Sequence, residues 1–291
     1  MDKHALRIDL FNSTLEIIRQ GWYIAKDGSK VTLPSVSEVM SEAVMYSEPV
    51  SLLIDPIEPI TTDIRVEDKD CVLAAIELIE AGYNPAMLNL ADLYTPGGLV
   101  EYGSGAQEEN LCRRSNLILS LYQFSQARVR QYPDLGLSAS TDQYPMDERY
   151  GGIYSGICTF FRGPESTGSE LEGNAYNIPV ISVAALSGPR LGPDGMMLPE
   201  ETEITLDKMR TIFRIGMMQG HDSLVLSAMG CGAFANPPAH IAKLFHHVIE
   251  EDEFKDKFRL IDFAILDGYR TGLKHNPEGN QKPFQKEFGA L

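Results

Sequence analysis

Two adjacent carboxylates, Glu108 and Glu109, follow a glycine-rich stretch and stand at the start of an apolar helical pattern. The stretch reads TPGGLVEYGSGAQEENLCRRS over residues 95–115. Ser104 and Gln107 match a capping box, and carboxylates in a first helical turn are favoured by the helix dipole, so one interpretation is purely structural. The other is that the loop wraps a ligand and that a carboxylate acts on it.

The helical pattern helps to separate the two carboxylates. A stripe at spacing 3 to 4 begins at Leu111 and ends at Tyr122, and Glu108 continues it toward the N-terminus, whereas Glu109 lies ~100° around. We therefore expect Glu108 to point toward the protein or a cleft. A carboxyl group beside apolar surface is partly desolvated and suits the general acid of a glycosidic cleavage. Adjacent carboxylates cannot easily flank a sugar as acid and nucleophile, so one must bind hydroxyls while the other does the chemistry.

Alternating strand and helix patterns must position these residues. Short, mostly apolar runs predict buried strands at 87–91, 180–184, 223–227 and 261–266. Patterns between and before them predict helices at 3–20, 35–46, 71–81, 107–124, 204–219 and 238–250. This alternation predicts a mainly parallel sheet covered by helices on both faces.

Two glycine-rich loops follow predicted strands. Residues 92–106 come after the strand at 87–91, and residues 228–238 come after the strand at 223–227. Ligands of open α/β sheets bind outside the carboxyl ends of the strands. We therefore expect both loops at the same edge of the sheet.

The composition limits the ligand and the compartment. A net charge of −16 argues against broad nucleic-acid binding, so an anionic ligand must be held locally, for which backbone N–H groups suffice. The four cysteines lack metal-ligand spacing, and we expect reduced thiols, a cytoplasmic protein (or a nuclear one in a eukaryote), and neither a metal nor a cofactor. The N-terminus does not read as a secretory signal, and no apolar run is long enough for a membrane span.

No linker, repeat or low-complexity segment divides the chain. We expect a single domain over 1–291, with an N-terminal helical extension at 1–65 and a core at 66–291.

Several stretches together resemble the microbial type of poly(ADP-ribose) glycohydrolase, a branch of the macrodomain superfamily. They are residues 89–92, 96–98 and 103–109, the N-terminal stretch 14–23, the second loop 227–238 and the late strand 262–265. The resemblance implies a macrodomain-like three-layer α/β/α fold with a mixed, mainly parallel sheet. It also implies a glycohydrolase that releases ADP-ribose by cleaving the bond of the distal ribose.

The resemblance assigns roles to individual residues. It implies Glu109 as general acid and base, with Glu108 and Gln107 orienting ribose hydroxyls and Asn89 near that ribose. It implies two loops that cradle the diphosphate and contact the substrate: Gly97, Gly98, Leu99 and Val100 in the first, and Gly230, Cys231, Gly232, Ala233, Phe234 and Ala235 in the second. Phe234 would pack on the distal ribose. The residue that stacks on adenine stays open among Tyr122, Tyr132, Tyr154 and Tyr176.

Two positions depart from the family pattern. Leu99 replaces a third glycine, and Asp92 stands where relatives carry Asn or Ser. A side chain at residue 99 restricts the backbone and is expected to change the path of the loop. Two alternatives stay open: a non-catalytic reader of ADP-ribose, and a hydrolase of an ADP-ribosyl link to a protein side chain or nucleic acid. We expect ADP-ribose or an ADP-ribosylated protein as substrate, and a monomer.

Overall fold

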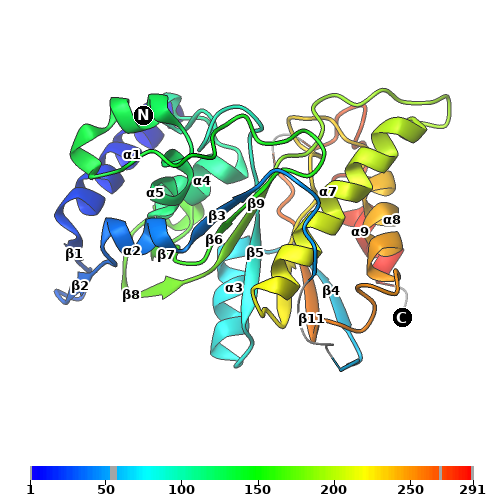
Figure 1. Cartoon of the computed structure of the whole chain (residues 1–291), viewed down its shortest axis with the longest axis horizontal. Coiled ribbons are helices and arrows are strands. Elements are labelled where there is room, and N and C mark those ends of the chain that lie inside the picture. The colour runs from blue at the N-terminus through cyan, green and yellow to red at the C-terminus, as the bar shows by residue number, and fades with distance from the viewer. Residues whose placement is uncertain (1, 53–57, 269–270, 290–291) are drawn as a thin grey trace. The chain divides into compact units, whose positions relative to one another are not determined.

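The computed structural model describes residues 2–52, 58–268 and 271–289 (Figure 1). The remaining residues of the expected extension and core, 1, 53–57, 269–270 and 290–291, lie outside the described residues. The chain divides into two compact units. The first holds Met1–Met45, Ala91–Met146 and Ile153–Ser182, and the second holds Tyr46–Leu90, Asp147–Gly152 and Val183–Leu291.

Parallel strands form the centre of the second unit. Their order is β5 (Pro85–Leu90), β10 (Ser223–Leu226), β11 (Leu260–Ala264) and β4 (Asp63–Glu67), and each neighbouring pair is parallel. β10 and β11 are buried along their whole length, as their continuous apolar runs predict. β4 is not predicted from the sequence, because Asp63, Arg65 and Glu67 interrupt its apolar pattern.

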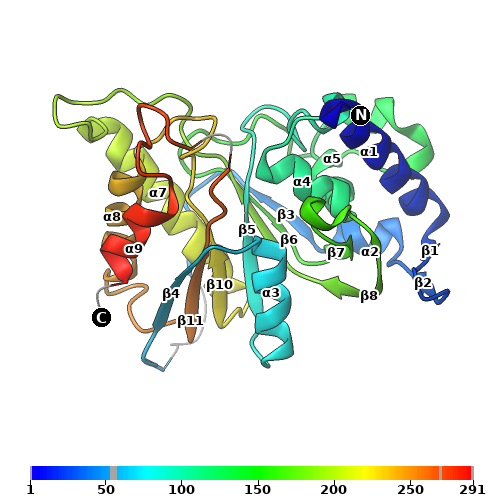
Figure 2. The ribbon, with the colours of Figure 1, turned by 180° about the vertical axis from the view of Figure 1, so that it is seen from behind.

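Helices cover both faces of these strands (Figure 2). α3 (Cys71–Glu80) packs on β5, β10 and β11. On the other face, the ring of Phe263 in β11 contacts Phe245 of α8 (Pro238–Ile249) and Phe284 of α9 (Gln281–Phe288), while α7 (Pro199–Met218) packs on α8. The chain is therefore an α/β protein with a mostly parallel central sheet flanked by helices, as expected.

The first unit combines helices with short strands. β6 (Gly152–Ser155) lies between β3 (Ala43–Tyr46) and β9 (Val180–Val183), and the pair β6–β9 is antiparallel. β1 (Trp22–Ile24) pairs with β2 (Lys30–Thr32), and β7 (Thr159–Arg162) pairs with β8 (Leu171–Asn177). The helices are α1 (Lys3–Gln20), α2 (Val36–Ser41), α4 (Gln107–Arg114), α5 (Leu117–Tyr122) and α6 (Gln126–Gln131), with single 3-10 turns η1 (Val100–Tyr102), η2 (Pro133–Leu135) and η3 (Glu165–Thr167).

The predicted helix at 35–46 is wrong in its second half. Ser35 and Glu38 form a capping box that starts α2, but the helix ends at Ser41. Residues 43–46 form strand β3 instead, beside β6. Pairing within a sheet has overridden a weak helical pattern.

The predicted helix at 107–124 is broken at Ser115, which has an extended backbone. The Ser115 hydroxyl donates to the carbonyl of Leu111 at 2.8 Å and accepts from the N–H of Leu117 at 3.2 Å. The side-chain oxygen of Asn116 accepts from the N–H of Thr159 at 2.7 Å, which ties the break to β7. Short polar side chains have thus replaced the helical hydrogen bonds.

The predicted helix at 204–219 begins earlier, since α7 starts at Pro199, a favoured first helical residue. No helix in the described part of the chain has the length and apolar character that crossing a membrane requires.

Candidate functional site

The carboxylate of Glu108 organises the glycine-rich loop of the first unit. One oxygen accepts from the N–H of Asp92 at 2.9 Å, and the other accepts from the N–H of Gly97 at 3.2 Å. The side chain is only 3% exposed. Glu108 therefore points into the protein, as its position on the apolar stripe predicts, and it joins the two ends of residues 92–97.

Glu109 uses its two oxygens differently. Oε1 accepts from the N–H of Leu99 at 3.0 Å, whereas Oε2 is buried and has no hydrogen-bond partner among the described residues. The side chain is 6% exposed, so both carboxylates are largely withdrawn from water. A carboxyl oxygen held in this way can donate or accept a proton at a bound ligand.

Gly98 brings the backbone against both carboxylates. Its φ of +57° lies in the left-handed region, and a Cβ built there would lie 2.5 Å from Oε1 of Glu109 and 3.2 Å from Oε2 of Glu108. Any larger residue would displace the Glu109 side chain. Glycine at this position is thus a requirement of the carboxylate geometry.

The expected capping box at the start of α4 is not formed. The N-cap is Ala106, and no side chain caps the helix. The main chain of Ser104 is held instead by Nη1 of the buried Arg113, which donates to its carbonyl at 2.6 Å. A residue of the helix thus fixes the segment that leads into it.

The two departures from the family pattern fit this loop. Leu99 has φ −102°, which any residue adopts, and its side chain is exposed. The backbone conformation of Leu99 therefore gives no reason for the expected change in the path of the loop. Asp92 accepts from the N–H groups of Tyr94 and Thr95 at 2.8 and 2.7 Å, and Asn or Ser side chains can make the same kind of turn.

Uncharged groups lie around the carboxylates. Burial raises the pKa of the Tyr144 hydroxyl well above its ordinary value, and the charge of Glu108 adds to this effect. Burial likewise raises the pKa of the Cys112 thiol, and Glu108 and Glu109 raise it further. The Cys112 thiol therefore stays protonated, which argues against a thiolate nucleophile.

Helix α1 and η3 hold the segment before α4 through a shared carboxylate. Glu165 accepts two hydrogen bonds from Arg7 at 2.9 and 2.8 Å. Nη2 of Arg113 lies 3.8 Å from the same carboxylate. Because Arg113 also holds Ser104, the pair Arg7–Glu165 supports the N-terminal end of the carboxylate-bearing helix.

The first loop has few free backbone donors. The N–H groups of Gly97 and Leu99 donate to the two glutamates, and those of Gly98 and Val100 donate to the carbonyls of Thr95 and Gly97 at 2.9 and 3.3 Å. All four are therefore already engaged within the protein.

The loop after β10 in the second unit is different. Within the described part of the chain, the N–H groups of Gly232, Ala233 and Phe234 make no hydrogen bond. Three successive free N–H groups on a turn form a concave site for an anion. Gly232, Ala233 and Phe234 are thus the sequence-predicted positions whose backbone donors are free among the described residues.

The side chain of Asn236 closes this second loop. Its Nδ2 donates to the carbonyls of Leu186 and Gly230 at 2.7 and 3.1 Å. Gly230 has φ +71°, and a Cβ there would lie 2.4 Å from Nδ2 of Asn236. Cys231 is buried, and its carbonyl lies 2.8 Å from Nε2 of His275.

The predicted site residues thus fall into two groups. The first unit brings together Gln107, Glu108, Glu109 and residues 97–100, while Asn89 and residues 230–235 belong to the second unit. Of the tyrosines considered for stacking, Tyr122 and Tyr154 are buried in the core.

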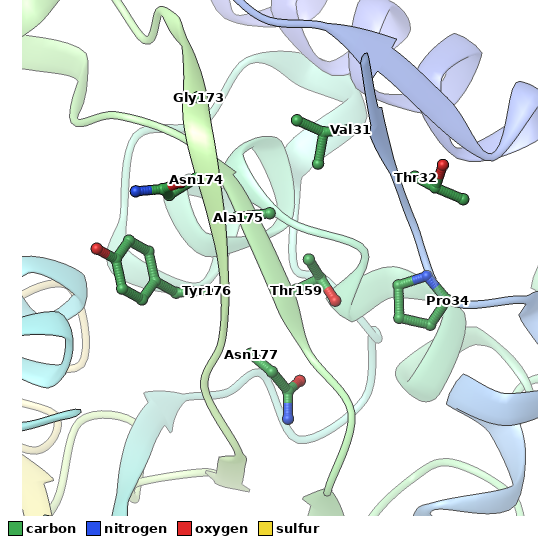
Figure 3. A pocket seen from close by; sticks show the side chains of 9 residues that line it. All are labelled: Val31, Thr32, Pro34, Thr159, Gly173, Asn174, Ala175, Tyr176 and Asn177. Carbon is green, nitrogen blue, oxygen red and sulfur yellow. The ribbon is translucent and has the colours of Figure 1, made fainter. Parts of the chain in front are cut away.

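A shallow groove of about 570 Å³ lies elsewhere in the first unit (Figure 3). It runs between β2 and the β7–β8 hairpin, with Val31 on one side and Thr159 and Ala175 on the other. Its lining contains no charged residue and no residue of the loop 95–109. The groove is therefore a feature of the hairpins and not of the carboxylates.

Comparison with known proteins gives consistent results. A family model described as microbial-type PARG, catalytic domain, matches residues 12–163. The chain is similar to poly(ADP-ribose) glycohydrolase from Thermomonospora curvata bound to the inhibitor ADP-HPD, with 26% identity, a TM-score of 0.77, and coverage of 97% of this chain and 99% of that one. The enzyme from Deinococcus radiodurans in complex with ADP-ribose has a similar fold, with 24% identity, a TM-score of 0.66, and coverage of 90% and 99%. No curated protein matches the chain.

Proposed function

The chain belongs to the microbial-type poly(ADP-ribose) glycohydrolase family and is a glycohydrolase, and we propose that Glu109 is its general acid and base. The bond cleaved is the glycosidic bond of the distal ribose of an ADP-ribosyl substrate, and ADP-ribose is released. The observation that carries the assignment is the unequal use of the Glu109 oxygens, because Oε2 alone is left without a protein partner among the described residues.

The proposed reaction uses one carboxyl group twice. Protonated Glu109 gives its proton from Oε2 to the leaving oxygen as the bond between that oxygen and the anomeric carbon breaks, which leaves an oxocarbenium-like ribose. The carboxylate then takes a proton from water, whose oxygen bonds to the anomeric carbon. The Leu99 N–H holds Oε1, so it orients the group in both steps.

Glu108 has a different role in this proposal. Both of its oxygens accept from backbone N–H groups, of Asp92 and Gly97, so it holds the loop in shape and orients ribose hydroxyls with its remaining lone pairs. Gln107, in the same helical turn, supplies a further polar contact. Loss of Glu108 therefore weakens binding as well as turnover.

The loop at 230–235 binds phosphate oxygens in this proposal. Its free donors are the N–H groups of Gly232, Ala233 and Phe234. Backbone donors bind an anion without adding positive charge, which agrees with a chain of net charge −16.

The test compares two isosteric variants. Purified protein is incubated with poly(ADP-ribose), released ADP-ribose is measured by chromatography, and the Kd for ADP-ribose is measured by calorimetry. We expect Glu109→Gln to lower kcat by about 10²–10⁴-fold with little change in Kd. Glu108→Gln lowers kcat and raises Kd together, because an amide cannot accept from both N–H groups.

The matched control is Glu16→Gln, which changes an exposed glutamate of α1. Equal release by Glu109→Gln and wild type removes Glu109 from the mechanism. Binding of ADP-ribose without release by wild type indicates a reader, and a protein that neither binds nor releases ADP-ribose contradicts both functions.

A further inference from the structure

Leu99 contacts the carboxylate of the proposed general acid, Glu109, through its backbone, and its side chain is the nearest one in this loop that reaches the surface. Its N–H lies 3.0 Å from Oε1 of Glu109, and the preceding Gly98 has no side chain and no room for one. The Leu99 side chain is nevertheless 54% exposed. It therefore starts beside the carboxylate and extends to the surface.

Tyr102 stands on the same face as Leu99. The N–H of Tyr102 donates to the Leu99 carbonyl at 3.0 Å and closes the 3-10 turn η1. Side chains three residues apart eclipse each other in such a turn. Because Tyr102 is 69% exposed, the turn carries one apolar and one aromatic side chain at the surface, and these two side chains are named here the Leu99–Tyr102 platform.

The platform is rigidly mounted. Between its two members, Glu101 turns inward and forms an ion pair with Arg128 at 2.6 Å, and it also accepts from Gln131 at 2.7 Å and from the Tyr132 hydroxyl. The Leu99 N–H is fixed by Glu109 at the other end. Because the backbone of this turn is held by these contacts, ligand binding does not have to order the turn, and the entropy cost is limited to the two side chains.

The chemistry of the polymer identifies that ligand. If Glu109 is the general acid, its carboxyl group contacts the leaving oxygen. The part of the substrate that is attached to this oxygen must then extend from Glu109 toward the protein surface. In a polymer of ADP-ribose the leaving oxygen belongs to the ribose of the next adenosine, whose base is a flat, uncharged ring. Such rings stack on aromatic and apolar side chains with about 1–3 kcal/mol per base.

We propose that the Leu99–Tyr102 platform binds the adenine base of the penultimate ADP-ribose unit and so selects polymer over single ADP-ribosyl groups on proteins. The inference rests on the proposed function, since it takes Glu109 as the acid. It assigns a positive role to Leu99, the residue by which this chain departs from the glycine of its family.

The test measures binding without turnover. In the Glu109→Gln background, Kd is measured by calorimetry for ADP-ribose and for a dimer of two linked ADP-ribose units. We expect the dimer to bind more tightly, and we expect Leu99→Gly, Leu99→Ala and Tyr102→Ala each to weaken dimer binding by about 5–160-fold, the range of one stacked base, while ADP-ribose binding is unchanged.

Leu6→Ala serves as the control for Leu99→Ala, because Leu6 is an equally exposed leucine of the same unit, at 51%. The same three platform variants are also assayed, with Glu109 present, for kcat/KM on polymer and on a mono-ADP-ribosylated peptide. A selective loss on the polymer supports the platform.

Three results overturn the inference: a dimer that binds no more tightly than ADP-ribose, platform variants that weaken both ligands equally, or a loss confined to the peptide. Failure of the proposed function is distinguishable from these. Wild type would then release no ADP-ribose from either substrate, while the dimer measurement would still report whether the platform binds the second base.

Discussion

The N–H of Leu99 donates to Oε1 of Glu109 at 3.0 Å, so the residue that stands where the resemblance leads us to expect a third glycine also fixes one oxygen of the candidate acid. The bond uses only the backbone of Leu99. The side chain is left free to vary without loss of the carboxylate geometry. This explains how the site tolerates leucine at residue 99 but requires glycine at residue 98.

Replacement of Gly98 by alanine should abolish activity. The new Cβ would lie 2.5 Å from Oε1 of Glu109, so the carboxylate must move, and we expect kcat to fall at least 100-fold. Left-handed strain and the clash together should lower the free energy of unfolding by about 1–3 kcal/mol. Turnover assays and urea denaturation measure the two effects.

Gly136→Ala separates strain from contact. Gly136 has φ +71°, but a Cβ there would meet no atom within 4 Å. We expect a loss of about 1–2 kcal/mol with activity retained. If both variants lost activity equally, the clash with Glu109 would not be the cause.

Glu165→Gln should destabilise the first unit. Arg7 and the buried Arg113 would lose the carboxylate they share, and Arg113 makes no other ion pair in the described structure, although the charge of Glu109 also acts on it. Charged partners left unpaired cost about 1–3 kcal/mol of unfolding free energy. Because Arg113 holds Ser104 ahead of α4, we also expect a several-fold fall in kcat.

The control for Glu165 is Glu170→Gln, which removes the exposed ion pair with Lys26. Exposed pairs contribute about 0–1 kcal/mol, so stability and turnover should hardly change. A similar effect of both variants would show that Glu165 is an ordinary surface charge.

Asp262 should make the second unit more stable at low pH. Burial in β11, together with the nearby Glu67, raises its pKa from 3.8 to about 6, although Lys69 and Arg65 act in the other direction. The folded state therefore binds the proton more tightly than the unfolded chain does. The stability that this group contributes is fully present below pH 3.8 and is lost as the pH rises through about 6.

Asp262→Asn removes this titration. We expect the variant to exceed wild type in unfolding free energy by about 1–3 kcal/mol at pH 8, since each pKa unit corresponds to about 1.4 kcal/mol. The difference should shrink toward zero at pH 4. Urea denaturation at both pH values gives the comparison, and a difference independent of pH would contradict the assignment to Asp262.

The elements that carry the site can be predicted from local sequence patterns. Mostly continuous apolar runs at 180–184, 223–227 and 261–266 predict buried strands because both faces of a central sheet exclude water, and the buried strands β9, β10 and β11 lie there within one residue or two. The spacing of Gly97, Gly98, Glu108 and Glu109 indicates the loop and the helix start as a candidate site. This is possible because the backbone freedom of glycine and the acid–base chemistry of glutamate are properties of the single residue.

The contacts that these residues make depend on the folded chain. The break at Ser115 depends on contact with β7, and the support of Ser104 depends on Arg113 and, through it, on Glu165, which lies 52 residues farther along the chain. The unequal hydrogen bonding of the two Glu109 oxygens arises from the folded path of residues 97–99. Such contacts join positions with no periodic relation, so local propensity cannot specify them, and packing of the whole unit does.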